Sequence, residues 1–145
     1  MLAGILAHLR DVLPVPDTPD VAIAEDIDIL TDMCGRVESG SVVIMPFREQ
    51  ADPSPLASGG FRQRVAVHFV TAIVIRTFDD LLGAERALQF DGHRRRLEQA
   101  LAGWEPPGAT SPCQLVGGES SAITTGVSVF TQTWETARFL TGHRP

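Results

Sequence analysis

The sequence contains no lysine, so all 12 of its basic residues are arginines. A phosphate-binding Walker A loop requires a lysine, and the glycine pattern GxGxxG is absent as well. The nucleophile motif GxSxG is missing, and no two histidines have the HxH or HExxH spacing of a zinc site. The chain therefore lacks the residue sets of the common enzyme classes, and we expect no catalytic residue, no metal and no cofactor.

Cysteine and long apolar runs are also scarce. Cys34 and Cys113 are too few for a disulfide scaffold and lie outside any CxxC or CxxH pair, which predicts free, buried thiols in a reducing cytoplasm. The longest apolar run, near 70–75, is far shorter than the roughly 20 residues of a membrane helix. The first residues, MLAGILAHLRDVL, have no basic stretch before their apolar positions and carry Arg10 and Asp11. They predict an amphipathic helix rather than a signal peptide, and no membrane partner.

The chain is acidic, with a net charge of −6 from 18 acidic and 12 basic residues. Phosphate contacts need concentrated positive charge, so bulk electrostatics make a compact acidic domain a poor binder of nucleic acid. Like charges repel within a Debye length of about 8–10 Å, so such a protein can lie beside DNA without binding it.

Hydrophobic periodicity, prolines and glycines divide the chain into expected elements. Their order is helix, short strand, helix, strand, strand, helix, strand, strand, which predicts an α+β fold: a small, mostly antiparallel sheet packed by a long helix and an N-terminal helix. The length of 145 residues predicts a single domain over 1–145. The expected helices span 2–13 and 81–102, and the expected strands span 41–47, 61–78, 113–116 and 122–139, with a turn at Gly117–Gly118. The pattern in 20–35 is ambiguous: 21–24 fit a short strand and 27–34 fit a helix.

A mobile loop is expected at residues 48–60, where two prolines, two glycines and several small polar residues interrupt the pattern. The strand that follows is unusually long: at ~3.3 Å per residue it would span roughly 50 Å or more, so part of it should bend or project. Arginines on one face of this strand can pair with an acidic neighbour across an interface, or can simply face water. The candidate interface with another subunit or a partner protein consists of Arg48, Gln50, Asp52, Arg62 and Arg64.

A sharp corner follows the long helix in the segment LAGWEPPGA. Gly103 is suited to end the helix, and Pro106 and Pro107 prevent its continuation. Trp104 is expected to pack the last helical turn onto the sheet, with an assembly surface as the alternative. We therefore predict a structural corner at Trp104, Pro106 and Pro107.

Five stretches within residues 40–140 together resemble one protein family. They are VVIMPF before the Pro/Gly-rich loop, GGFRQRVAVHFVTAIVIRT, LAGWEPPG, CQLVGGE and SVFTQTWETARFL. The last stretch places Phe130, Gln132, Trp134 and Thr136 in an aromatic–Gln–aromatic–Thr pattern, with slightly altered spacing. The combination is similar to the tail terminator proteins of long-tailed phages and prophages, which are also called minor tail or tail completion proteins.

The resemblance implies a structural virion protein made in the cytoplasm of a bacterial host. It implies a small α+β subunit that assembles with copies of itself into a ring, a hexamer, at the head-proximal end of the tail. The ring would bind the tail tube protein, end polymerisation of the tube and offer a surface to a neck or head-completion protein. DNA would pass through the ring without sequence-specific binding.

Two alternatives stay open at the level of the sequence. A neck or head-closure protein, which connects head and tail, shares the small size, the acidity and the ring assembly. A small ligand-binding domain or an enzyme of unknown type is the other; a monomer with an enclosed polar pocket would favour it.

Overall fold

The computed structural model describes residues 1–15, 17–25, 27–34, 37–55, 60–76, 84–124 and 127–142. Within them the helices and strands follow the predicted order, and the fold is α+β. The elements are α1 (Leu2–Val12), β1 (Val21–Ile23), α2 (Ile27–Cys34), β2 (Val42–Ala51), β3 (Arg62–Arg76), α3 (Ala84–Leu101), β4 (Ser111–Thr124) and β5 (Val127–Thr141).

The strands form one mixed sheet of five strands in the order β1-β2-β3-β5-β4. The short β1 runs parallel to β2, and the other three strand pairs are antiparallel. β3 lies in the middle and pairs with β5 along its whole length, from Arg62 opposite Thr141 to Arg76 opposite Val127. A central strand with both faces covered needs apolar side chains at successive positions, which explains the apolar run near 70–75.

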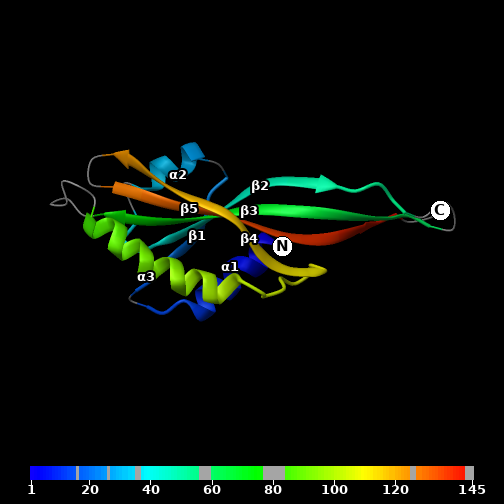
Figure 1. Cartoon of the computed structure of the whole chain (residues 1–145), viewed down its shortest axis with the longest axis horizontal. Coiled ribbons are helices and arrows are strands. Elements are labelled where there is room, and N and C mark those ends of the chain that lie inside the picture. The colour runs from blue at the N-terminus through cyan, green and yellow to red at the C-terminus, as the bar shows by residue number, and fades with distance from the viewer. Residues whose placement is uncertain are drawn as a thin grey trace.

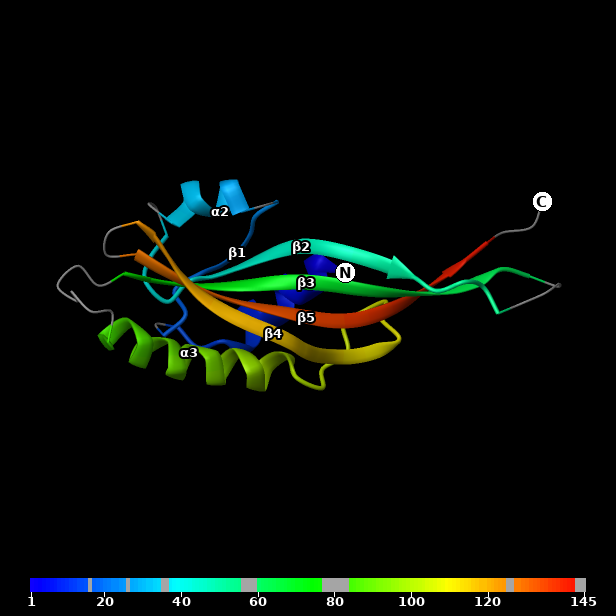
Figure 2. The same ribbon diagram turned by 45° about the horizontal axis from the view of Figure 1, so that its top comes forward.

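Helices cover both faces of one end of the sheet, with α1 and α3 on one face and α2 on the other (Figures 1 and 2). Alternate residues of β3 serve the two faces: Phe69 and Ile73 belong to the core under α1 and α3, whereas Ala72 and Val74 belong to the core under α2. The larger core also contains Ile5, Leu9, Ile44, Leu97, Leu101 and Trp134, and the smaller one contains Leu30, Val43, Met45, Val127 and Val129.

The connection predicted at residues 48–60 begins later than the sequence indicates. β2 shifts register between Pro46 and Arg48 and then continues in pairing with β3 as far as Ala51. The polar composition of 48–51 favours a loop locally, but the long β3 offers backbone partners that hold the segment as a strand. Residues 56–59 lie outside the described part of the chain.

The turn predicted at Gly117–Gly118 is wrong, because both glycines lie inside β4. β5 accordingly begins at Val127, and the residues between the two strands, 125 and 126, are not among those described. A Cβ at Gly118 would lie 3.0 Å from the carbonyl oxygen of Thr131 and 3.2 Å from Cγ of Gln132. The glycine therefore permits close approach of two strands rather than a turn.

The aromatic–Gln–aromatic–Thr pattern lies at alternate positions of β5. Alternation places these four side chains on one face of the strand, toward α1 and α3. Two of them join β5 to α3, one joins it to β3 and one joins it to β4, so the pattern has a structural explanation. The Phe130 ring tilts against Phe90 at 5.8 Å between centroids, Gln132 Nε2 donates to Glu98 Oε1 at 2.9 Å, Trp134 Nε1 donates to Thr71 Oγ1 at 3.1 Å, and Thr136 Oγ1 donates to the Ser111 carbonyl at 2.6 Å.

Candidate assembly interface

Three strands run from beside the start of α1 outward past the helices and form what we call the arm, residues 48–55, 60–67 and 136–142 (Figures 1 and 2). Backbone hydrogen bonds extend its ladder beyond the end of β2: the Asp52 N–H donates to the Arg64 carbonyl at 2.9 Å. At the far end the Gly142 N–H donates to the Phe61 carbonyl at 3.3 Å. The arm is thus ordered by its own pairing although it extends away from both cores.

The five residues predicted at an interface all lie on the arm, and all are exposed. Beyond the bulge, the register pairs even-numbered residues of β2 with even-numbered residues of β3. Paired residues point to the same face, and so do alternate residues of one strand. The sequence-predicted residues therefore share one face of the arm, which we call the arginine face: Arg48, Gln50, Asp52, Arg62 and Arg64.

Local contacts hold the distal side chains of the arginine face in place. The guanidinium carbon of Arg62 lies 3.8 Å from the centroid of the Phe139 ring, a cation–π contact. Arg64 Nη1 lies 3.9 Å from Asp52 Oδ2. These side chains border a shallow hollow of about 410 Å³. Such exposed pairs contribute roughly 0–1 kcal/mol each, so both arginines stay available to a partner.

The opposite face of the arm carries a bidentate ion pair between its two outer strands. Arg138 of β5 donates from Nε to Glu49 Oε1 at 3.2 Å and from Nη2 to Oε2 at 2.9 Å. The hydrogen bonds that Arg138 donates to the Glu49 carboxylate raise the pKa of Arg138. Sequence reasoning missed this pair because the two residues are 89 positions apart, and only the strand register brings them together.

The charge of the arm is opposite to that of the whole chain. The arm carries arginines at 48, 62, 64 and 138 against carboxylates at 49 and 52, whereas the chain has a net charge of −6. The remainder of the protein is therefore more acidic than the chain as a whole. A positive projection on an acidic body suits contact with another acidic surface.

The corner after α3 joins three elements. Gly103 has a φ of +79°, as expected of a helix end, and its N–H donates to the Cys113 carbonyl of β4 at 3.0 Å. The carbonyl of Trp104 accepts from the Cys113 N–H at 2.8 Å. The Trp104 ring packs against the larger core and stacks on His8 of α1, with 3.8 Å between ring centroids.

The two prolines complete the contact with α1. Pro106 is buried and Pro107 is exposed. Pro107 lies so close to α1 that a Cβ at Gly4 would be 3.0 Å from its Cδ. The corner thus packs against a helix as well as the sheet.

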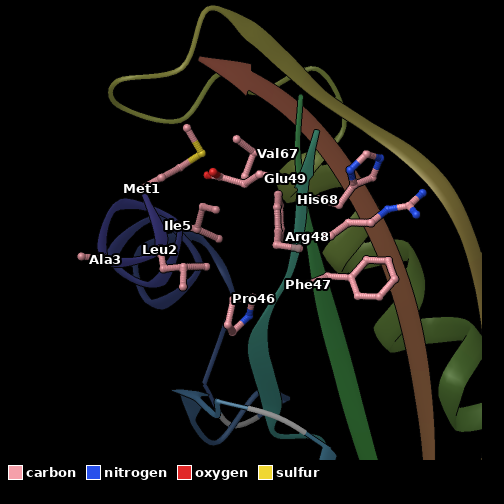
Figure 3. A pocket seen from close by; sticks show the side chains of 11 residues that line it. Met1, Leu2, Ala3, Ile5, Pro46, Phe47, Arg48, Glu49, Val67 and His68 are labelled. Carbon is pink, nitrogen blue, oxygen red and sulfur yellow. The ribbon is translucent and has the colours of Figure 1, made fainter. Parts of the chain in front are cut away.

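An apolar hollow of about 550 Å³ lies between the start of α1 and the open side of β2 (Figure 3). Leu2 and Ile5 of α1 line it together with Val67 and Phe69 of β3. Figure 3 shows Glu49 and Val67 pointing toward α1, and Arg48 and His68 pointing to the other side of the strands. The lining comes from three separate segments, so no pattern in the sequence indicated this hollow.

The described part of the chain offers few groups suited to metal binding or to reaction as a nucleophile. Those residues contain no group of three or more His, Cys, Asp or Glu side chains suited to hold a metal ion. Burial raises the pKa of the Cys113 thiol to about 11, so it stays protonated at neutral pH. The side chain of Cys34 lies outside the described residues. No described helix has the length and apolar character needed to cross a membrane.

Comparison with known proteins identifies the family. The sequence matches the model of phage tail terminator proteins over residues 2–144. The chain belongs to this family. The resemblance seen in the sequence is thereby confirmed, and a tail terminator is a structural protein of a phage tail, not a member of an enzyme family.

Solved structures show the same fold. A chain in the virion of a native gene transfer agent particle is similar to this tail terminator with a TM-score of 0.60 and 9% sequence identity, covering 98% of this chain and 95% of that chain. At this identity the likeness concerns the fold. The comparison with curated protein sequences gives no match.

Proposed function

We propose that this protein caps the head-proximal end of the phage tail tube as a ring of identical subunits, a hexamer. The cap ends polymerisation of the tube protein and presents a surface to a neck or head-completion protein. The observation that carries the proposal is a tail terminator sequence over residues 2–144 folded with an arm that extends past its helices. Family membership supports the role in the tail, and the arm supplies a means of reaching a neighbour.

The arginine face supplies the chemistry of assembly in this proposal. Arg62 and Arg64 stand exposed on a paired, ordered strand, so binding a partner orders few new groups. Their guanidinium groups can each pair with a carboxylate of an adjacent subunit or of the tube. The net charge of −6 is unfavourable for DNA retention, so DNA passes the assembled virion cap without sequence-specific binding.

A tube-length assay tests the proposal. Tube protein of the same phage is polymerised alone and with increasing amounts of the purified full-length chain, and tube lengths are measured by negative-stain electron microscopy. We expect the wild type to bind at tube ends and shorten the tubes. The variant with Arg62→Glu and Arg64→Glu should fold but should no longer limit tube length. Arg95→Glu, an exposed reversal on α3, is the matched control and should behave as the wild type.

Two results would contradict the proposal. Tubes of unchanged length with the wild-type protein would exclude a terminator. Binding to a portal-side adaptor in place of the tube would then assign the chain to the neck or head-closure class. Normal capping by the double reversal would remove the arginine face from the interface and leave the terminator function in place.

A further inference from the structure

The sheet has an unpaired strand edge on each side, formed by different strands. β4 is the last strand at one edge. At the other edge β1 pairs with β2 only at Val42–Ile44. Among the described residues, the outer side of β2 is therefore open from Met45 to Ala51. A molecule with two different open edges can associate head to tail, each copy using one edge against the opposite edge of the next.

One edge carries an apolar projection and the other an apolar hollow. On β4, Leu115 and Val116 are 46% and 56% exposed. Beside β2 lies the hollow under α1, lined by Leu2, Ile5 and Phe69. Water contact is unfavourable both for the exposed apolar side chains at one edge and for the apolar hollow of about 550 Å³ at the other. Both apolar surfaces are removed from water when the side chains fill the hollow.

Strand register places the projection and the hollow at the same position along the strands, which we call the same height on the sheet. Pro46 is opposite Phe69, Phe69 is opposite Trp134, and Trp134 is opposite Leu115. This row crosses the sheet from one edge to the other. Directly opposed residues point to the same face. Because Phe69 and Trp134 face α1 and α3, Leu115 and the hollow lie on that same face as well.

The edges at this height favour contact through side chains over backbone pairing. β2 has a proline at 46 and shifts register immediately after it. β4 has a proline at 112 and shifts register on both sides of the Gln114–Leu115 pair. Prolines and bulges interrupt the row of backbone donors and acceptors, and they are known protections against edge pairing. They leave the apolar side chains as the complementary groups.

We propose that Leu115 and Val116 of one copy insert into the hollow between α1 and β2 of the next copy. The occupant of the hollow is thus a second copy of this chain, and the proposal rests on the assembly of a ring proposed above. Equal height at both edges means that successive copies are related by rotation with little translation along the strands. Such a head-to-tail contact forms a ring when the rotation between copies closes after a whole number of subunits, whereas a contact with a shift along the strands would generate a helical filament.

Disulfide crosslinking between two single-cysteine substitutions tests the contact. Leu115→Cys and Leu2→Cys are purified separately as full-length chains, mixed and oxidised. We expect a covalent dimer on a non-reducing gel from the mixture only. The wild type, which keeps the native cysteines, and each variant alone are the controls. Crosslinking of Leu115→Cys with itself would show a two-fold contact and overturn the proposal. An oligomer without crosslinks in the mixture, or a wild type that stays monomeric, would overturn it equally.

A charge substitution gives a second, independent measurement. Leu115→Glu should weaken self-association by about ten-fold or more, measured by analytical ultracentrifugation, because it places a carboxylate in an apolar site. Leu88→Glu is the matched control: Leu88 is 75% exposed and lies on α3, in neither edge strand nor the lining of the hollow, so the association of this variant should be unchanged. Equal association of the two variants would contradict the proposal.

These results are separable from those of the tube-length assay. A wild type that limits tube length but shows no Leu2–Leu115 crosslink retains the terminator function and loses this contact. A wild type that crosslinks as expected but leaves tube length unchanged forms the contact without being a terminator.

Discussion

The imidazole ring of His8 lies flat on the indole of Trp104, with 3.8 Å between ring centroids and 4° between their planes. The same imidazole donates from Nε2 to the carbonyl oxygen of Ala100 at 2.8 Å. One side chain of α1 therefore contacts both the last turn of α3 and the corner that follows it. These two contacts of His8 join α1 to the end of α3.

Removing the Trp104 ring should destabilise the protein. We expect Trp104→Ala to lower the free energy of unfolding by about 3 kcal/mol, because the ring is partly buried against the core and stacked on His8. Trp104→Phe should retain most of this stability, and Glu105→Ala, at an exposed position, should retain all of it. Chemical denaturation measures the three variants. A Trp104→Ala protein as stable as the wild type, but unable to assemble, would place the ring at a subunit interface instead.

Substitutions of Gln132 and Glu98, which share a hydrogen bond, should have non-additive effects on the free energy of unfolding. Glu98→Leu leaves the buried amide of Gln132 without its acceptor and should cost about 1–3 kcal/mol. Replacing both residues with leucine removes the unsatisfied donor together with its partner. We therefore expect the double variant to be more stable than the sum of the two single changes predicts, as a double-mutant cycle by urea denaturation would show. Additive losses would contradict the structural role of the bond.

Two adjacent glycines of β4 should respond differently to the same substitution. A Cβ at Gly118 meets the Thr131 carbonyl oxygen at 3.0 Å, whereas a Cβ at Gly117 meets nothing within 4 Å. Gly118→Ala should lower stability by about 1–3 kcal/mol through overpacking, and Gly117→Ala should leave it nearly unchanged. Thermal unfolding of both variants measures the difference. Equal melting temperatures would contradict the strand register described for β4 and β5.

Stability should fall as the pH drops below about 6.5 because of His93. Burial lowers the pKa of His93 from its ordinary value of 6.5, the adjacent Arg96 lowers it further, and Asp17 opposes the change. The unfolded chain then binds a proton at a pH where the folded chain does not, so acid favours unfolding. We expect the free energy of unfolding to decrease from pH 7 toward pH 5. His93→Gln should remove part of this slope, and an identical slope in the variant would exclude His93 as its source.

The sequence by itself determined the order of the elements and the family. Period-2 alternation in 62–69, helical spacing in 2–13 and a glycine before the Trp-Pro-Pro corner are local patterns, and local backbone preference and burial are enough to interpret them. Composition and charge indicate the five candidate interface residues. Their position on one face of the arm follows from alternation together with the strand register.

Only the tertiary structure decided which segments pair. Residues 48–51 have a loop-like composition and become a strand because β3 lies beside them. Gly117–Gly118 resembles a turn but lies inside β4, where Gly118 permits the close approach of β5. The Glu49–Arg138 ion pair, the hollow under α1 and the common height of Leu115 and Pro46 depend on residues far apart in the chain. Such relations are set by strand register and by the placement of helices on the sheet. The free energy that selects them comes from burial across the whole molecule, which a local window of sequence does not contain.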